Sequence, residues 1–156
     1  MEYDVEIRQL SQKFANDYPE KIFPELMLKR GRPYTCLLID THDDFFICVP
    51  FRSSISHNTA YLFKNTKRSK KSRSGLDYTK MALIKDTDYI DNTTAIVDND
   101  EYVETIQNIE RIVRDVNKYI SDYCKHIKQE DKLAERDFAR RYKYSTLPYF
   151  HDILGL

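Results

Sequence analysis

Two β-rich runs flank a polar turn in the stretch YTCLLIDTHDDFFICVPF, residues 34–51. Residues 34–40 and 45–51 carry the β-branched and aromatic side chains, and residues 41–44 are typical of a turn. The pattern predicts a β-hairpin. Because both runs are almost continuously apolar, we expect central strands that are covered on both faces. Pro50 has no N–H to donate, so the strand ladder should end or bulge there.

The chain before the hairpin shows one strand and one short helix. Residues 5–10 alternate apolar and polar side chains, which predicts a half-buried strand. Ser11 is a suitable N-cap for a helix that Pro19 would stop. Residues 22–28 are apolar but interrupted by proline, so we expect an irregular segment with one helical turn. The basic segment KRGRP at 29–33 is punctuated by glycine and proline and predicts a turn.

Further strands are predicted after the hairpin. Residues 60–63 indicate a short strand, residues 76–85 a longer one, and Tyr89–Ile90 an edge strand. Asp98 or Asp100 would then begin a helix.

The longest periodic pattern lies in the C-terminal half. Apolar residues recur at spacings of three and four from Tyr102 to Ile127, which predicts one long amphipathic helix, with a break near Asn117. A last short helix is predicted from Ser145 or Thr146, with proline in its first turn, to Gly155. The pattern as a whole favours an α+β fold in which an antiparallel sheet packs with several helices.

Length and composition predict one folded domain over residues 1–156. The chain is 41% hydrophobic and 13% aromatic, which argues against disorder. It contains no apolar run long enough to cross a membrane, and its acidic N-terminus is unlike a secretory signal. Three scattered cysteines do not form a disulfide or zinc pattern. We therefore expect a cytoplasmic protein with no membrane partner.

Charge is segregated along the chain although the net charge is zero. Residues 64–73, called the basic loop below, hold six basic residues and no acidic one, whereas residues 86–101 hold six acidic residues and no basic one. A positive lobe of this kind favours a polyanion as partner, above all a nucleic acid. The alternative is a solvated loop that keeps the protein soluble.

The residues VPFRSSISHN at 49–58 carry groups suited to RNA cleavage. In metal-independent cleavage the 2′-hydroxyl attacks its own phosphorus, and the protein supplies a base, an acid and cations. His57 can move a proton as general acid or base, Arg52 can bind a phosphate oxygen, and Ser53 can hold the phosphate or ribose. Two plainer interpretations stay open: His57 as an ordinary loop histidine, and Arg52 as an ion-pair partner on the sheet.

Other chemistries have weaker support. Ser53 and His57 lack the Gly-x-Ser-x-Gly elbow of hydrolases, and three glycines in all do not make a nucleotide-binding loop. Asp40, Asp43 and Asp44 lie in one turn, the usual place for solvated aspartates. We therefore expect no metal site and no cofactor.

Aromatic residues near cations could stack on unpaired bases, although half or more of them should belong to the core. They are Tyr34, Tyr61, Phe63, Tyr78, Tyr142 and Tyr144.

Four ordered segments resemble a known family. They are RPY at 32–34, PFRSSISH at 50–57, GLDYTK at 75–80 and YSTLPYFH at 144–151. Together they resemble the type III toxins, which are endoribonuclease partners of RNA antitoxins, in the ToxN/AbiQ group and most closely its CptN and TenpN branches. The segments keep the order expected of the family and are spread over residues 32–151, most of the length of the chain.

The resemblance implies a strongly bent antiparallel sheet surrounded by helices, related to the MazF/Kid toxin fold. It implies sequence-specific, metal-independent cleavage of single-stranded cellular or phage RNA, leaving a 2′,3′-cyclic phosphate. It also implies that a repeated pseudoknot RNA is processed by the toxin and inhibits it in a closed toxin–RNA assembly. The biological role would be growth arrest or phage defence by abortive infection in the bacterial cytoplasm.

The resemblance also assigns roles to residues. Ser53 matches the family serine, and His57 matches a histidine of the closer branches. Several relatives have a lysine where this chain has Ile55, so Arg52, Lys64 or Lys80 would supply the catalytic cation. The residues expected to bind RNA are Lys29, Arg30, Arg32, Tyr34, Lys67, Arg68, Lys70, Lys71, Arg73, Asp77, Arg140 and Arg141.

Two other functions fit parts of the sequence. A non-catalytic RNA-binding module would use the same basic loop and aromatics, and its binding would depend steeply on salt. A protein–protein adaptor would use the long amphipathic helix, although such an apolar stripe is more simply part of a core.

Overall fold

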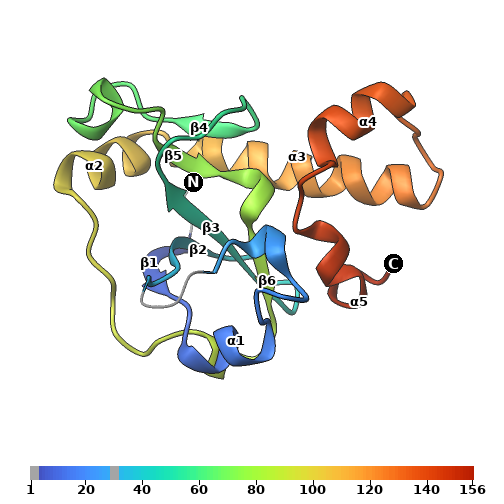
Figure 1. The fold of residues 1–156 in the computed structure, drawn as a ribbon, viewed down its shortest axis with the longest axis horizontal. Coiled ribbons are helices and arrows are strands. Elements are labelled where there is room, and N and C mark those ends of the chain that lie inside the picture. Colours follow the sequence, from blue (N-terminus) through green and yellow to red (C-terminus); the bar gives the residue numbers. More distant parts are fainter. Residues whose placement is uncertain (1–3, 29–31) are drawn as a thin grey trace.

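A computed structural model describes residues 4–28 and 32–156 and has an α+β fold with an antiparallel sheet (Figure 1). The strands follow the order β1-β2-β3-β5-β4, and β6 pairs with β3 beside this path. Among the described residues no pairing joins β1 to β4, so closure into a barrel is not seen. The strands are β1 (Val5–Gln9), β2 (Thr35–Asp40), β3 (Phe46–Arg52), β4 (Ala60–Leu62), β5 (Gly75–Asp77) and β6 (Ala82–Ile84).

The predicted hairpin is confirmed as β2 and β3. The two strands pair from Asp40↔Phe46 to Cys36↔Pro50, and their central residues are buried on both faces. The ladder to β2 ends at Pro50 as expected, although β3 itself continues to Arg52. Beyond Pro50 the strand pairs with β5 instead, which brings the end of β3 to a second group of strands.

The strand predicted over residues 76–85 is wrong, because it is interrupted. A 3₁₀ turn over Tyr78–Lys80 separates β5 from β6, although both strands pair with β3. The pairs Phe51↔Leu76 and Cys48↔Ala82 lie three residues apart on β3 but six residues apart on the partner segment. The partner therefore leaves the ladder between them. The Asp77 side chain accepts a hydrogen bond from Thr79 N–H and caps this turn, which stops the strand.

The first predicted helix is confirmed, whereas the predicted edge strand at residues 89–90 is not a full strand. In α1 (Gln12–Asp17), Ser11 is the N-cap and its Oγ accepts a hydrogen bond from Phe14 N–H. The edge strand predicted at 89–90 is only a single bridge, Leu10↔Ile90.

The single long helix is also wrong. The chain forms α2 (Asn99–Gln107) and α3 (Ile109–Ile127), and the break lies at Asn108 rather than near Asn117. The Asn108 side-chain amide donates to Glu104 O and so competes with continued helical hydrogen bonding. The apolar face of α3 is core, whereas Tyr102 and Ile106 of α2 are 46% and 39% exposed.

The C-terminal segment packs against the interrupted strand. It contains α4 (Glu135–Tyr142), a 3₁₀ turn over Leu147–Phe150 and α5 (His151–Leu154), and α4 folds back beside the end of α3 (Figure 1). Thr146 N–H donates to Thr79 O, and Thr146 Oγ1 donates to Met81 O. The helix end at Gly155 is confirmed, with φ of 71°. These contacts place the segment around Thr146 against the 3₁₀ turn at Tyr78–Lys80 and the following Met81.

In the described part of the chain, no helix has both the length and the apolar character needed to cross a membrane.

Candidate active site

A buried carboxylate organises the end of β3. Asp77 has no exposed surface, and it accepts hydrogen bonds from Arg52 Nη1 at 2.6 Å and from the hydroxyl and N–H of Thr79 at 2.6 and 3.0 Å. Both of its oxygens lie 3.2 Å from His57 Nε2. Arg52 pairs with Gly75 in the antiparallel β3–β5 ladder, so Asp77, two residues further along β5, is its diagonal neighbour. The expectation that Asp77 contacts RNA is corrected: it is buried and orients its neighbours.

His57 is held at both ring nitrogens. Its Nδ1 lies 3.1 Å from Thr59 N and accepts a hydrogen bond from this backbone group. Its Nε2 faces the carboxylate of Asp77. A lone pair on one nitrogen and a carboxylate at the other is the resting arrangement of a general base. His57 is therefore a fixed group and not a freely solvated loop histidine.

Arg73 fastens the loop that carries His57. Its guanidinium donates to Ile55 O and His57 O, both at 2.9 Å, and to Asn58 Oδ1 at 2.6 Å. Arg73 was expected to bind RNA, and its side chain is instead committed to the protein. Ile55, which stands where the resemblance would place a lysine, is 2% exposed and packs as an apolar residue, so no cation is available there.

Lys80 is a buried cation next to this group. It is 6% exposed, and its ammonium donates to Glu25 Oε1 at 2.8 Å and to Tyr144 O at 2.7 Å. An ammonium has three N–H groups, so one remains for a further acceptor. The Tyr34 hydroxyl donates to the Lys80 carbonyl, and its burial raises the Tyr34 pKa well above the usual value.

The four segments that carry the family resemblance meet at this place. Tyr34 contacts Lys80, Lys80 contacts Tyr144, and Arg52 contacts Asp77. Thr146 joins the C-terminal segment to Thr79. Segments far apart in the sequence are thus joined by hydrogen bonds that use both side-chain and backbone atoms.

Two hollows open beside the group. The His57 hollow, of about 270 Å³, and the Ser53 hollow, of about 390 Å³, share Arg52 and Met27. Ser53 and His57 therefore lie on different sides of Arg52. The His57 hollow is lined by Met27, Arg52, Ser54, Ser56, His57, Thr59, Thr79, Lys80, Arg140, Arg141 and Tyr144. The Ser53 hollow is lined by Leu26, Met27, Leu28, Arg32, Pro33, Tyr34, Thr35, Pro50, Phe51, Arg52, Ser53 and Arg68.

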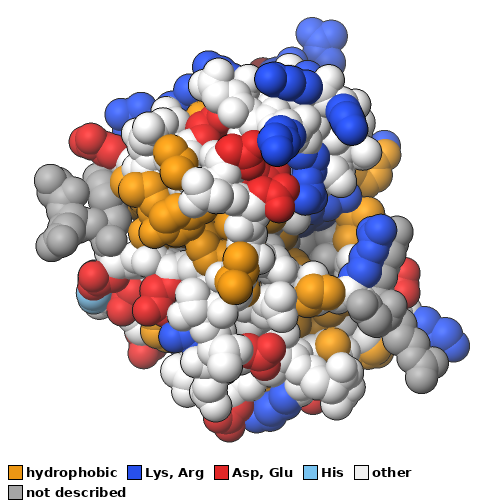
Figure 2. All heavy atoms as spheres, turned by 90° about the vertical axis from the view of Figure 1, so that its left-hand side faces the viewer, with side chains coloured by type: hydrophobic (Ala, Val, Ile, Leu, Met, Phe, Trp, Pro, Cys, Tyr) orange, Lys and Arg blue, Asp and Glu red, His pale blue; other side chains and the backbone are white. Residues whose placement is uncertain are grey.

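The basic loop does not stand apart from the acidic segment, contrary to expectation. The backbone N–H groups of Lys64 and Asn65 donate to the buried carboxylate of Glu104, and Arg68 pairs with Asp98 and Glu101. Figure 2 shows acidic side chains next to the basic ones on this face. Glu104 thus holds the backbone of the loop, and Asp98 and Glu101 of the acidic segment neutralise part of its charge.

Four lysines of the basic loop are unpaired within the described part of the chain. Across residues 4–28 and 32–156, no ion pair involves the side chains of Lys64, Lys67, Lys70 or Lys71. Lys64 lines neither hollow, so the structure does not bring it to the site as a catalytic cation. These lysines can still attract the backbone of a nucleic acid from outside the hollows.

The other cations predicted to bind RNA line one of the two hollows, where the structure describes them. Arg140 and Arg141 of α4 line the His57 hollow and also pair with Asp137 and Asp122, each at 3.2 Å. Arg32 lines the Ser53 hollow. Lys29 and Arg30, predicted to bind RNA, lie outside the described residues.

Most of the aromatic candidates belong to the core. Tyr61, Phe63, Tyr78 and Tyr142 are 3–6% exposed, and burial raises the pKa of Tyr142 to about 12. They cannot stack on RNA. Tyr34, which is half-buried, and Tyr144, which is 61% exposed, retain a surface for stacking.

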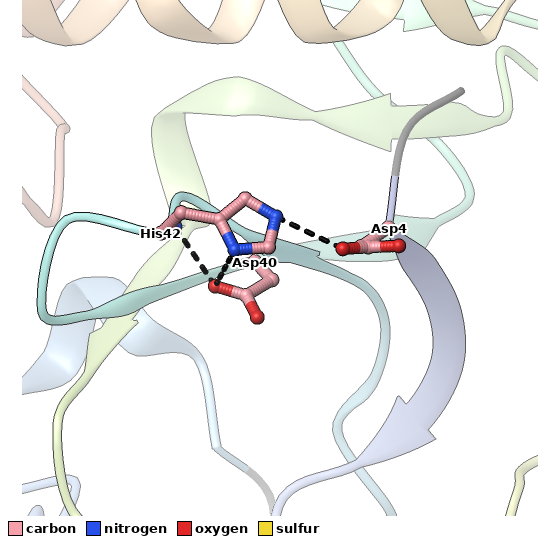
Figure 3. A group of neighbouring side chains, drawn as sticks. All are labelled: Asp4, Asp40 and His42. Carbon is pink, nitrogen blue, oxygen red and sulfur yellow. Dashed lines mark hydrogen bonds and ion pairs between the residues drawn. The ribbon is translucent and has the colours of Figure 1, made fainter.

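A separate cluster contains the one described group of side chains close enough to share a metal ion, namely Asp4, Asp40 and His42 (Figure 3). His42 Nε2 lies 2.9 Å from Asp4 Oδ2, and Nδ1 lies 3.7 Å from Asp40 Oδ1. His42 thereby links the start of β1 to the end of β2. The cluster is at the opposite end of β2 from Tyr34, so it is not part of the site around His57.

Three residues of the site were missed from the sequence: Thr59, Thr79 and Glu25. The spacing Asp-x-Thr at 77–79 is typical of an aspartate that caps a turn, and this signal could have identified Thr79. Thr59 acts through its backbone and Glu25 through a contact 55 residues away, and neither has a local signature.

The chain matches no protein-family model, no curated protein and no solved structure.

Proposed function

We propose that the chain is a metal-independent endoribonuclease and the toxin of a type III toxin–antitoxin system. The observation that carries this proposal is the Asp77-centred group of Arg52, Thr79 and His57 beside a cationic hollow. The convergence of the four segments that resemble the ToxN/AbiQ group supports the family assignment. The same convergence supports the proposal that the sheet is related to the core of the MazF/Kid toxins.

His57 acts as the general base. Bound RNA displaces Thr59 N–H from Nδ1, and this nitrogen then takes the proton of the attacking 2′-hydroxyl. The 2′-oxygen forms a bond to phosphorus, the bond from phosphorus to the 5′-oxygen breaks, and the leaving oxygen takes a proton from solvent. Asp77 stabilises the imidazolium that forms. The products are a 2′,3′-cyclic phosphate and a 5′-hydroxyl.

The developing negative charge on phosphorus is stabilised by cations that line the hollow. Arg52 lies between the two hollows with one nitrogen committed to Asp77, so its other N–H groups can reach a phosphate. Lys80 supplies its third N–H. Ser53 holds the phosphate or the ribose from the other side of Arg52.

The partner is the repeated pseudoknot antitoxin RNA, which the toxin processes and which then inhibits it in a closed assembly. The free lysines of the basic loop and Tyr144 support contacts with this RNA and with cellular or phage substrates. The protein would act in the bacterial cytoplasm in phage defence.

One observation favours a second function. Because both nitrogens of His57 are occupied, the same surface would also serve as a non-catalytic RNA-binding module.

Cleavage and binding assays on variants of His57, Ser53 and His42 distinguish the two functions. The RNA is the transcript of the region upstream of the gene, where the resemblance places a tandem repeat. The wild-type protein should cut this transcript, whereas His57→Ala and Ser53→Ala should bind it with near wild-type affinity and leave it intact. His42→Ala, a change at an exposed histidine outside the site, is the matched control and should cut normally. Normal cleavage by both site variants would remove these roles, and binding without cleavage by the wild-type protein would favour the binding module.

A further inference from the structure

A third hollow continues the two that flank Arg52. The Gln12 hollow, of about 720 Å³, shares Leu28, Arg32, Pro33 and Tyr34 with the Ser53 hollow. Since the Ser53 hollow in turn shares Arg52 and Met27 with the His57 hollow, the three form a continuous track. The track leads from α4, past the end of β3, to the N-terminal turn of α1.

Charge changes along this track. Each of the first two hollows is lined by at least three cations and, among the described residues, by no carboxylate. The Gln12 hollow has Arg32 as its single described cation, and its lining includes two carboxylates, Glu20 and Asp91. Among the described residues, the lining cations therefore favour a phosphate in the first two hollows, and the two carboxylates disfavour one in the third.

The other polar groups of the Gln12 hollow suit a nucleobase. Gln12 and Asn16 lie one turn apart on α1, and Gln12 Nε2 donates to Asn16 Oδ1 at 2.9 Å. This bond leaves the Gln12 carbonyl oxygen and the Asn16 amide N–H groups as an acceptor and a donor. Such a pair matches the edge of a base, and carboxylates accept hydrogen bonds from exocyclic amino groups. Tyr34, at the junction with the Ser53 hollow, offers a ring face for stacking.

We propose that the Gln12 hollow binds an unpaired, amino-bearing nucleobase of the RNA, at a position removed from the scissile phosphate, and so sets a sequence preference. The inference rests on the proposed function for its substrate class. It adds a recognition site on α1, a helix that has no part in the chemistry. Uracil, which has no exocyclic amino group, should be the least favoured base.

The test compares oligo(C) with oligo(U), because the two bases have the same ring size and differ in an amino group. Binding to the intact protein is measured by fluorescence anisotropy. The wild-type protein should prefer oligo(C). In the double variant Gln12→Ala/Asn16→Ala the affinity for oligo(C) should fall about tenfold, which is within the usual range for one base contact, while the affinity for oligo(U) is unchanged. Gln107→Ala, an exposed amide on α2, is the matched control.

Three results would overturn the inference: no preference of the wild-type protein, equal affinities of variant and wild type for oligo(C), or an equal loss for both RNAs. An unchanged thermal unfolding midpoint in the double variant shows that the two substitutions leave the fold intact. The binding readout is independent of cleavage. Amide-dependent preference for oligo(C) without cleavage of any RNA would support this base-binding site and contradict the proposed function. Cleavage of RNA without that preference would contradict only the base-binding site.

Discussion

His57 Nε2 lies 3.2 Å from the carboxylate of Asp77, a residue with no exposed surface. The same carboxylate binds Arg52, so one buried charge fixes both a base and a cation at the edge of the His57 hollow. The proposed mechanism depends on this relationship.

Replacing Asp77 should disable the site and weaken the fold. In Asp77→Asn the imidazolium loses its stabilising charge, and single-turnover cleavage at saturating RNA should fall by about 10²–10⁴-fold. Because the change leaves Arg52 without its partner, the free energy of unfolding should fall by roughly 3 kcal/mol, as measured by urea denaturation. Glu6→Gln, at an exposed ion pair with Arg8, is the control and should change neither quantity appreciably. An Asp77→Asn protein that cuts at the wild-type rate would contradict the role given to this carboxylate.

Arg73 and Lys71 should have different kinetic effects although they are near neighbours. Arg73→Ala frees the His57 loop, so the cleavage rate at saturating RNA should fall by about 10–100-fold with little change in RNA affinity. Lys71→Ala should lower affinity and reduce the dependence of log K on log salt by about one, without changing the saturated rate. The measurement is a titration of RNA at several salt concentrations. If Arg73→Ala instead lowers RNA affinity and its salt dependence, Arg73 contacts RNA, and its hydrogen bonds to the His57 loop do not matter for the cleavage rate.

Glu104 should control the basic loop from outside it. Its buried carboxylate accepts hydrogen bonds from the Tyr61 hydroxyl and from the backbone of Lys64 and Asn65. Glu104→Ala leaves these donors unsatisfied, so the free energy of unfolding should fall by about 2–4 kcal/mol. RNA affinity should fall as well, because the loop loses its anchor. Glu104→Gln keeps an acceptor, so its free energy of unfolding and its RNA affinity should lie between those of the wild type and of Glu104→Ala. Unchanged RNA affinity in a folded Glu104→Ala protein would show that the loop needs no anchor to bind.

Glu101 should make stability depend on pH. Burial raises the pKa of this carboxyl group, although Arg68 lowers it in part. The folded state then holds the proton more tightly than the unfolded state. The resulting stabilisation is complete below the unfolded pKa and is lost as pH rises through the folded pKa. Glu101→Gln removes the ionised form, so it should unfold at higher urea concentration than the wild type at neutral pH, and the difference should shrink at acidic pH. The exposed Glu110→Gln is the control. A less stable Glu101→Gln protein at neutral pH would mean that the contact with Arg68 outweighs the burial.

Local sequence predicted those parts of the fold that depend on local chemistry. The hairpin, the Ser11 cap and the end of the β2 ladder at Pro50 follow from side-chain alternation, capping and a missing N–H. The turn inside residues 76–85 and the helix break at Asn108 depend on side chains that bind backbone groups, Asp77 and Asn108. Apolar periodicity does not detect such hydrogen bonds. The strand was therefore predicted as unbroken, and the helix break was placed near Asn117 rather than at Asn108.

The site shows the same division. Arg52, His57 and Lys80 were identified from residue type and from the resemblance, and the fold brings them together. Arg73 and Asp77 were expected at the RNA surface because a sequence shows charge and not the partner that neutralises it. Both are committed to partners within the protein, and those partners are set by tertiary contacts.

The most direct measurement is the cleavage of a single-stranded RNA by the purified protein in excess EDTA, with the product ends identified by mass spectrometry. The proposed mechanism predicts undiminished cleavage, a 2′,3′-cyclic phosphate on the upstream product, and no cleavage where the nucleotide before the cut is replaced by its 2′-deoxy form. Loss of activity in EDTA, cleavage at the 2′-deoxy nucleotide, or no cleavage of any RNA would contradict it.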